Sequence, residues 1–285
     1  MKKFLSVLMA GAMLFGVLTL AGCGDTTTDT GEDTTTTEDT TTTAEFTTVT
    51  EGVLTMSTNA AFPPYEMTDD SGNIVGIDAE IAAAIAEKLG LELQIDDMDF
   101  DGALAAPQSG KSDIVMAGVT VNEERQLVLD FTETYANGVQ KVIVAEGSDI
   151  TMENLGEQQI GTQKGTTGNI LTTDEFGEDH VIAYDDAIAA VQALNNGQID
   201  CVVIDSAVAD NLVEANPGLT TLDTDYANEE YAIGVAKGNT ALLDAINTAL
   251  QELIDDGTVQ SIIDKYIPTD GTAADEAGTT DEAGA

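Results

Sequence analysis

Residues 103–115 read ALAAPQSGKSDIV and residues 190–202 read AVQALNNGQIDCV, so one pattern occurs twice at an offset of 87 positions. Each copy predicts a helix, a turn in which aspartate follows glycine by three positions, and a short apolar strand. The repeat therefore indicates two similar lobes. Because ligands of open α/β sheets lie beyond the carboxyl ends of the strands, we expect Gly118 and Asp205, which end the two strands, to face a common cleft.

Around the repeat, strands and helices alternate from about residue 52 to residue 266, which is typical of parallel α/β sheets. The predicted strands are 53–57, 91–95, 114–117, 142–145, 159–162, 181–184, 201–204 and 231–236. The predicted helices are 77–89, 101–109, one that begins at 123–127, 167–175, 185–196, 206–214, 240–256 and 258–266. Pro107 is expected to end the second helix early. The spacing of Thr120 and Glu123 predicts a capping box at the start of the third.

The first 22 residues have the features of a secretion signal. Two lysines at positions 2 and 3 precede an uncharged, mostly apolar run at 4–20, and residues 20–23 read LAGC. This ending resembles a bacterial lipobox, which implies cleavage before Cys23 and a lipid on that cysteine. An uncleaved membrane anchor is the alternative, because 17 residues approach the length of a membrane span. In both cases the rest of the chain lies outside the cytoplasm, attached to the outer face of the membrane.

Two further segments are too polar to form a core. Residues 23–50 are rich in Thr and Asp and are expected to be a disordered linker, and residues 269–285 are expected to be an acidic disordered tail. The whole chain is 42% apolar and 21% charged, so its central part should be globular. The 52 acidic residues outnumber the 9 basic ones, for a net charge of −43. Such a surface repels nucleic acid and anionic lipid headgroups and argues against both as partners.

Cysteine and histidine offer little to catalysis. Cys23 is expected to carry lipid, and Cys201 lies in the apolar run Cys201–Ile204, where a core position is favoured over a nucleophile. His180 is the only histidine, so neither a metal site nor a Cys-His dyad can be assembled. These counts argue against an enzyme, a metal and a cofactor.

Arg125 and Asp205 are the candidate ligand-binding charges. Arg125 is the only arginine, and its planar guanidinium can pair bidentately with a carboxylate, helped by backbone N–H groups near Thr120 at a predicted helix start. A structural ion pair with a nearby acid is an equal alternative. Asp205 can accept an ammonium group or can cap the helix that begins at Ser206. The two charges are complementary to the two ends of an α-amino acid.

Other candidate positions lie in loops. Phe62 and Phe100 follow strands, where they can stack on a ligand, although core positions are commoner for aromatic residues. Residues 161–168, GTQKGTTG, look like a phosphate loop but lack the spacing of that motif, so ATP is not expected. The loop can still offer N–H and hydroxyl donors to an anion.

At these positions the chain strongly resembles the bacterial extracellular solute-binding proteins of family 3, which serve amino-acid ABC importers. The matching stretches run from residue 53 to residue 267. They are TNAAFPPYE at 58–66, GID at 76–78, MDFDG at 98–102, QSGKSD at 108–113, AGVT at 117–120 with ER at 124–125, DFT at 130–132 and GTQKGTTG at 161–168.

The resemblance implies an α/β fold of two lobes that close like a clamshell (the type II periplasmic-binding-protein architecture), joined by two hinge strands. One lobe would comprise residues 51–137 and 232–268, and the other 138–231. Arg125 would bind the ligand α-carboxylate with backbone at Thr120 and Thr167. The α-ammonium would bind Asp205, the Gly118 carbonyl and the Thr120 hydroxyl. The remaining pocket residues implied by the resemblance are Asn59, Phe62, Phe100 and Gln163.

Three departures from the family pattern bear on the ligand. Pro107 is displaced by two residues, so its helix is expected to be irregular. Asn59 stands where relatives that take basic ligands often have Asp, which argues against lysine, arginine or ornithine. Apart from Arg125, which would bind the α-carboxylate, no basic residue other than Lys164 is expected near the pocket, which argues against aspartate or glutamate. The resemblance therefore favours a neutral polar amino acid such as glutamine.

The expected partners follow from the resemblance and from the N-terminus. They are a free amino acid, the permease subunits of an ABC importer, and the membrane through the lipid anchor, with the protein itself a monomer. Two other classes stay open: a ligand-sensing module for a surface receptor, and a small dehydratase-type enzyme on the same fold.

Overall fold

The computed structural model describes residues 46–268. The predicted signal peptide, the lipidated Cys23, most of the predicted linker and the predicted acidic tail lie outside the described residues. Three elements of the described part have the bounds predicted from the sequence: α1 (Ile77–Leu89), β9 (Val181–Tyr184) and α7 (Thr258–Tyr266). Most other predicted elements are present with ends displaced by one or two residues.

A nine-stranded sheet runs through the described part of the chain in the order β5-β1-β6-β12-β7-β10-β8-β9, with β11 also paired to β7. At one end, β1 (Val53–Thr58) pairs in parallel with β5 (Glu92–Asp97) and β6 (Ile114–Val115). At the other, β8 (Ile160–Gln163) pairs in parallel with β9 and β10 (Cys201–Asp205). The predicted parallel pairing thus occurs in two separate groups of strands.

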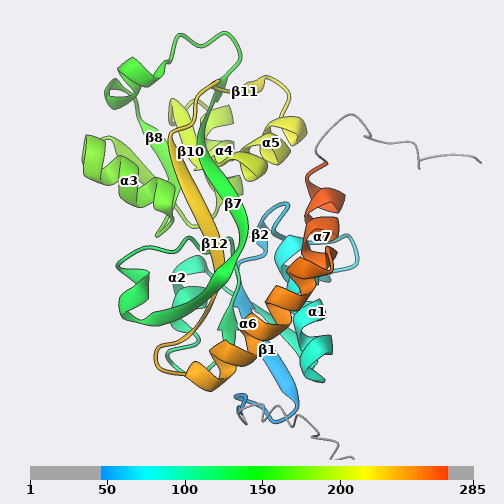
Figure 1. Ribbon diagram of the computed structural model, residues 1–285. Coiled ribbons are helices and arrows are strands. Elements are labelled where there is room, and N and C mark those ends of the chain that lie inside the picture. The colour runs from blue at the N-terminus through cyan, green and yellow to red at the C-terminus, as the bar shows by residue number, and fades with distance from the viewer. Residues whose placement is uncertain (1–45, 269–285) are drawn as a thin grey trace, which may run out of the picture. The chain divides into compact units, whose positions relative to one another are not determined.

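Two long antiparallel strands join these groups. Strand β7 (Leu129–Ala145) pairs with β12 (Ala227–Ala236) from Leu129 opposite Ala236 to Gln140 opposite Ala227. In Figure 1 they cross the middle of the described chain side by side. Only residues 142–145 of β7 and 231–236 of β12 were predicted as strand. The missed parts carry polar residues and glycine, which weaken a strand signal.

Helices cover both groups of strands (Figure 1). The first group, with its helices, is called lobe 1 here, and the second is called lobe 2. The helices of lobe 1 are α1, α2 (Phe100–Ala105), α6 (Thr240–Asp255) and α7. Lobe 1 also carries a small sheet of β2 (Ala61–Phe62), β3 (Glu66–Thr68) and β4 (Ile74–Val75). Lobe 2 has α3 (Thr167–Phe176), α4 (Ala187–Asn195), α5 (Ser206–Ala215), β11 (Leu219–Thr221) and the 3₁₀ helix η2 (Met152–Glu157).

The sequence repeat is confirmed in the structure. Its copies are α2 followed by β6 and α4 followed by β10, each with a left-handed glycine in the turn, at Gly110 (φ 68°) and Gly197 (φ 66°). Helix α2 ends at Ala105, just before Pro107, as predicted. Cys201 is a fully buried core residue, and burial raises the pKa of its thiol to about 12.

The predicted capping box at Thr120 and Glu123 is wrong. Thr120 forms an antiparallel bridge with Tyr231, which holds it extended, and the only helical turn nearby is the 3₁₀ helix η1 (Arg125–Leu127). The Asn122 side chain accepts a hydrogen bond from the Arg125 N–H at 2.8 Å and so caps this short turn instead. Arg125 is therefore positioned by a turn that follows a bridged strand, and not by a long helix.

Apolar periodicity builds the core of lobe 1. Ile77, Ile81 and Ile85 lie on one face of α1 and are fully buried in the cluster that also contains residues of α6. Full burial of such a side chain contributes about 1.5–3 kcal/mol. Gly90 then ends α1 in the left-handed conformation (φ 69°), and its N–H bonds to carbonyls of the last turn.

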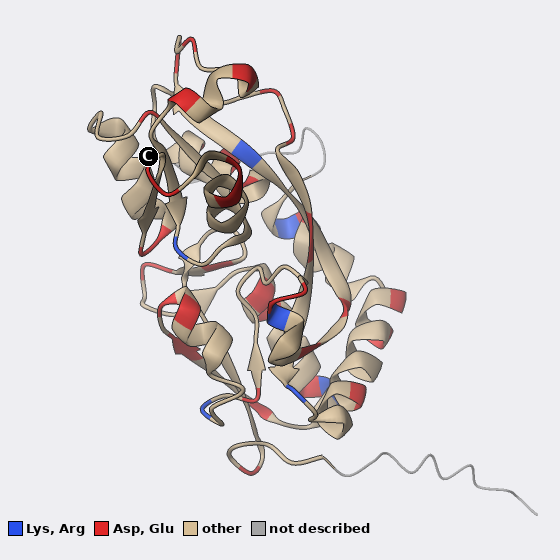
Figure 2. Ribbon diagram, turned by 90° about the vertical axis from the view of Figure 1, so that its left-hand side faces the viewer, with Lys and Arg blue, Asp and Glu red and all other residues tan. Residues whose placement is uncertain are grey.

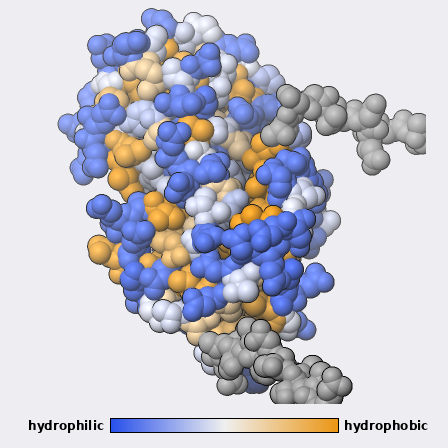
Figure 3. Space-filling model, in the orientation of Figure 1, coloured by the Kyte–Doolittle hydropathy of each residue, from blue (hydrophilic) through white to orange (hydrophobic). Residues whose placement is uncertain are grey.

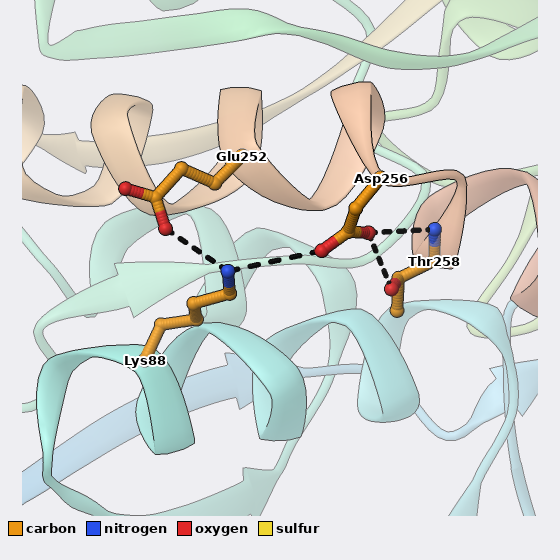
Figure 4. Close-up of polar contacts among 4 residues, drawn as sticks. All are labelled: Lys88, Glu252, Asp256 and Thr258. Carbon is orange, nitrogen blue, oxygen red and sulfur yellow. Dashed lines mark hydrogen bonds and ion pairs between the residues drawn. The ribbon is translucent and has the colours of Figure 1, made fainter.

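Ion pairs at the surface connect α1 to α6 and α7 (Figure 4). The Lys88 ammonium of α1 lies 2.9 Å from a Glu252 oxygen and 3.8 Å from an Asp256 oxygen. Asp256 also accepts hydrogen bonds from the backbone N–H (3.0 Å) and hydroxyl (2.6 Å) of Thr258, at the first turn of α7. This polar cluster lies over the outer edge of the lobe 1 core.

Acidic residues are spread over both lobes in Figure 2, while basic residues are few and separated. The face drawn in Figure 3 is mainly hydrophilic, with apolar residues in small groups between the charged ones. No helix within residues 46–268 has the length and apolar character required to span a membrane.

Candidate functional site

A pocket lies where β7 and β12 meet the ends of both groups of strands. Lobe 1, lobe 2 and the two long strands all contribute residues to it. Every position predicted to contact ligand lines this pocket: Asn59, Phe62, Phe100, Gly118, Thr120, Arg125, Gln163, Thr167 and Asp205. Seven further residues that the sequence did not single out also line it: Glu66, Ala117, Gln140, Thr166, Ile204, Glu229 and Tyr231.

Arg125 is a buried cation, 6% exposed, that bonds to backbone carbonyls. Its Nη1 donates to the Thr120 carbonyl at 2.8 Å, and its Nη2 donates to the Gly165 carbonyl at 3.2 Å. The guanidinium carbon lies 5.3 Å from the centroid of the Phe100 ring. None of the ion pairs found among residues 46–268 involves Arg125, so the structural ion pair considered above is not formed there.

Burial lowers the pKa of Arg125, and the carboxylates around it, Glu229 first, act in the opposite direction. The guanidinium nevertheless stays protonated, because the ordinary pKa of arginine is far above neutral. Its N–H groups that do not bond to carbonyls can bind a carboxylate in the pocket.

Asp205 caps α5, which is one of the two roles weighed from the sequence, and its other carboxyl oxygen lies at the pocket. Its Oδ1 accepts from the backbone N–H groups of Ala207 (2.9 Å) and Val208 (3.2 Å) and so caps α5. Its Oδ2 accepts from the Tyr231 hydroxyl at 2.9 Å and lies at the pocket. The residue is fully buried, and this desolvation raises the pKa of the carboxyl to about 6.

Glu229 joins the residues at the centre of the pocket. Its Oε1 accepts from the Thr120 hydroxyl at 2.6 Å, and its Oε2 accepts from the Tyr231 hydroxyl at 3.0 Å and from the Gln140 amide. The Thr167 hydroxyl of lobe 2 donates to the Thr120 hydroxyl of lobe 1 at 3.0 Å. Hydrogen bonds therefore connect both lobes to the hinge strand β12 at this carboxylate.

Glu229 was missed because the sequence does not show which face of β12 is buried. Alternation gives the signal in hindsight: Glu229 and Tyr231 are buried on one face of the strand, while Asn228 and Glu230 are exposed on the other. In a chain with 52 acidic residues, one more glutamate is not informative by itself.

Gly118 permits the close packing of Phe62. Its φ of 53° is left-handed, and a Cβ at this position would lie 2.8 Å from the Phe62 ring. The Gly118 N–H donates to Asp78 at 2.9 Å, and the Tyr135 hydroxyl donates to the same carboxylate at 2.7 Å. Phe62 also stacks on Tyr65, with ring centroids 5.8 Å apart. Phe62 and Phe100 are thus buried aromatics that also line the pocket.

Two amide side chains, Asn59 and Gln163, and one carboxyl side chain, Glu66, lie together on one side of the pocket. The Gln163 amide donates to the Asn59 side-chain oxygen at 2.8 Å, and the Asn59 amide donates to the Met98 carbonyl at 2.8 Å. The Gln163 side-chain oxygen and both Glu66 carboxyl oxygens are buried and accept no hydrogen bond from residues 46–268. Burial raises the pKa of Glu66 well above its usual value. These oxygens can accept hydrogen bonds from a ligand.

The lobes touch at the rim of the pocket. Besides the contacts of Arg125 with Gly165 and of Thr167 with Thr120, the Lys164 ammonium lies 2.7 Å from an Asp101 oxygen. Lys164 belongs to the phosphate-loop-like stretch 161–168, and the ion pair directs its charge toward lobe 1 at the pocket rim. Among residues 46–268, no group of three or more His, Cys, Asp or Glu side chains could hold a metal ion.

The model of the bacterial extracellular solute-binding proteins, family 3, matches residues 54–269. The chain belongs to this family. Members of the family bind solutes outside the cytoplasm and are not enzymes, so the dehydratase alternative is set aside.

Relatives in family 3 bind amino acids. A probable histidine-binding protein of Neisseria gonorrhoeae is 29% identical over 282 residues, covering 96% of this chain and 98% of the relative. An L-cystine-binding protein of Escherichia coli is 30% identical over 225 residues, covering 78% and 85%. The structure of an ancestral arginine-binding protein bound to glutamine matches with a TM-score of 0.73 at 39% identity, covering 76% of this chain and 99% of that one. The predicted two-lobed fold is therefore confirmed.

Proposed function

We propose that this protein captures a free polar amino acid with a neutral, glutamine-like side chain and delivers it to the permease subunits of an ABC importer. In this proposal Arg125 binds the ligand α-carboxylate, with backbone at Thr120 and Thr167. Asp205, the Gly118 carbonyl and the Thr120 hydroxyl bind the α-ammonium. The observation that carries the proposal is that one buried pocket is lined by Arg125, which has no carboxylate partner among residues 46–268, and by the carboxyl group of Asp205.

The side-chain end of the pocket supports a neutral ligand that donates hydrogen bonds. Asn59 and Gln163 are neutral, and the Gln163 oxygen accepts no hydrogen bond from the described residues. The pKa of Glu66 is raised by burial, which favours its neutral form and leaves it able both to donate and to accept. An amide side chain has both groups and is complementary to this set.

One observation favours a second candidate, a cationic side chain such as that of arginine. Both carboxyl oxygens of the fully buried Glu66 accept no hydrogen bond from residues 46–268, although Asp78 lies beside them, and a guanidinium would supply two parallel donors. Arginine binding would then require Glu66 to ionise, whereas glutamine binding would not. The two candidates therefore differ in the proton that Glu66 carries.

The remaining parts of the proposal concern attachment and movement. Cys23 carries a lipid that holds the monomer at the outer face of the membrane, after removal of residues 1–22. Residues 51–137 with 232–268 move against residues 138–231 about β7 and β12. A ligand that contacts both lobes stabilises the closed form by contacts that the open form lacks. A ligand-sensing role for a surface receptor would use the same closure, and a functional test of uptake distinguishes the two.

The experiment that tests the proposal is a thermal-shift screen of residues 45–285 against the twenty amino acids. A ligand that binds only the native state stabilises it by RT ln(1 + [L]/Kd), so millimolar ligand at micromolar Kd adds about 4 kcal/mol, a shift of several degrees. We expect the largest shift with glutamine. A larger shift with arginine selects the second candidate, and no shift with any amino acid, even after unfolding and refolding to remove retained ligand, contradicts the proposal.

A further inference from the structure

Two buried carboxylates at the pocket contact the same hydroxyl group. The Tyr231 hydroxyl lies 2.9 Å from Oδ2 of Asp205 and 3.0 Å from Oε2 of Glu229. Asp205 is fully buried, and Glu229 is 4% exposed. A phenol has one hydrogen, so it can donate well to only one of two ionised carboxylates. The second contact is satisfied when one of the carboxyl groups carries a proton and donates it.

The other contacts of the two carboxylates do not supply the missing hydrogen-bond donor. Oε2 of Glu229 also accepts from the Gln140 amide, and its Oε1 accepts from the Thr120 hydroxyl. Oδ1 of Asp205 accepts from the two backbone N–H groups that begin α5, which leaves Tyr231 as the one described donor to Oδ2. Because Oδ2 of Asp205 and Oε2 of Glu229 lie 2.9 Å and 3.0 Å from the same Tyr231 hydroxyl, these two oxygens are within about 6 Å of each other. At this separation one negative charge opposes ionisation of the second group.

The groups that face the pair from neighbouring elements oppose a second negative charge. Glu66 of β3 interacts with Asp205, and Tyr65, between β2 and β3, interacts with both members of the pair. Asp78 of α1 lies beside Glu66 and Tyr65. Arg125 of η1 is the facing cation, and its described hydrogen bonds go to carbonyls and not to the pair. Burial raises the pKa of Asp205 to about 6, and the charge of Glu229 contributes in the same direction.

The backbone of β7 closes the other side of the pair. Gly138 lies opposite Glu229 in the sheet, and a Cβ on Gly138 would collide with both the Asp205 carboxylate and the Tyr231 hydroxyl. No side chain can occupy that space, so the two carboxylates are enclosed between the strand backbone and the pocket. The pocket is then the side from which a new hydrogen-bond donor can reach them.

We infer that Asp205 and Glu229 together form the α-ammonium subsite and share one proton when the pocket is empty, which an incoming ammonium group displaces. This inference rests on the proposed function, since it needs a ligand with an α-ammonium group. The ammonium arrives with its own three hydrogens and donates to the carboxylates. The shared proton leaves to solvent, and the pair changes from one negative charge to two. Glu229 is thereby a ligand-binding residue that the sequence did not indicate.

Calorimetry measures the proton directly. We would titrate L-glutamine and L-arginine into the wild-type protein at pH 5.5, in buffers of different ionisation enthalpy. Both probes have an α-ammonium group, so proton release from the pair should accompany whichever one binds. Arginine should release a second proton, from Glu66, so the values expected for the pair are those measured with glutamine. We expect release of one-half to one proton per ligand, and a Kd that falls about tenfold per pH unit below the pKa of the pair and levels off above it.

Two matched variants locate the proton. Glu229→Gln should abolish the release and flatten the pH dependence of Kd, because the pair no longer has a second carboxyl. Glu230→Gln removes the same charge from the exposed face of β12 and should behave like wild type. Binding heats that do not depend on the buffer would overturn the inference. So would release that persists in Glu229→Gln and disappears in Glu66→Gln, since the proton would then belong to Glu66.

A ligand-free measurement separates failure of this inference from failure of the proposed function. If no amino acid binds in the thermal-shift screen, the proposed function fails, and the inference is decided by the ¹³C carboxyl resonances of the empty protein. We expect one carboxyl of the pair to titrate near pH 6 in wild type and that transition to be lost in Glu229→Gln. Two carboxyls that both ionise below pH 5 in the empty wild-type protein would contradict the shared proton.

Discussion

Arg125 in the pocket and Lys88 on the surface of α1 are two of the few cations in a strongly acidic chain, and their surroundings differ. Arg125 is 6% exposed and bonds to two backbone carbonyls, with no carboxylate partner among residues 46–268. The Lys88 side chain is 34% exposed and pairs with both Glu252 and Asp256 (Figure 4). Of these two cations, the one without a carboxylate partner among residues 46–268 lines the pocket, while the one with two acidic partners joins helices.

Among the substitutions that test this comparison, removal of the Arg125 guanidinium should have the largest effect on ligand affinity. We expect Arg125→Ala to weaken binding of the amino acid by more than tenfold, because loss of one partner of a buried charge pair costs about 2–5 kcal/mol. Titration calorimetry measures the Kd. Arg125→Lys is the matched control: it keeps the charge, loses the planar fork, and should bind with intermediate affinity. Unchanged affinity in Arg125→Ala would remove Arg125 from the site.

The opposite end of the pocket is tested by Asp205→Asn. Asparagine keeps an oxygen that can cap α5, so stability should change by less than about 1 kcal/mol. The charge that faces the ligand is lost, so affinity should fall by about tenfold or more. Parallel urea unfolding and calorimetry separate the two effects. A variant that loses stability while keeping its affinity would show that Asp205 is a capping residue alone.

A third prediction concerns pH and buried carboxyls of the pocket region. Burial raises the pKa of Asp78 and of Asp205 to about 6, above the value of about 4 in an unfolded chain. Between these values the folded protein binds more protons than the unfolded one, so its stability should fall as pH rises from 4 to 6. Glu66, whose pKa burial raises well above its usual value, should extend this fall to higher pH. Urea unfolding of the ligand-free protein at several pH values measures this slope.

Salt provides the control for the pH experiment. Repulsion among the many exposed acids also weakens the fold as pH rises, but salt screens exposed charges far more than buried ones. The slope should therefore persist at 0.5 M salt. A stability that no longer changes between pH 4 and pH 7 at that salt concentration would mean that the surface, and not the buried carboxyls, produces the pH dependence.

Lys88→Ala should have the smallest effect. Exposed ion pairs contribute about 0–1 kcal/mol, so unfolding free energy should change by less than about 1 kcal/mol and ligand affinity should not change. Thermal unfolding and calorimetry measure the two quantities. A loss comparable to that of Arg125→Ala would erase the distinction between the two cations and would show that the contact of α1 with α6 governs the pocket.

The sequence predicted the parts of the molecule that local patterns determine. The apolar stripe Ile77, Ile81 and Ile85 predicted α1, the glycine-aspartate turns predicted the repeated helix-strand unit, and charge complementarity selected Arg125 and Asp205. Residues 129–141 were missed as strand, because their burial comes from pairing with β12, which is distant in the sequence. The capping box at Thr120 failed for a related reason, since the bridge to Tyr231 overrides the local preference.

The central carboxylate of the pocket could not be predicted, because nothing in the local pattern distinguishes Glu229 from Glu230. Its role depends on donors from three separate segments, Thr120, Gln140 and Tyr231. Such a network becomes visible only when the strands are assembled. The resemblance to family 3 placed nine residues around one pocket, and the structure adds Glu66 and Glu229 to its lining.

The packing of α1 against α6 and α7 has a consequence for the order in which the two lobes can fold. Lys88 and Glu252, which join these helices, are 164 positions apart. During synthesis and export, α1 emerges early, but its covering helices belong to the last part of the folded chain, after the whole of lobe 2. Lobe 2 can therefore fold before α6 and α7 are available to pack on the apolar side of α1. A chain that stops before residue 240 would leave that side exposed, however complete the rest of its sheet.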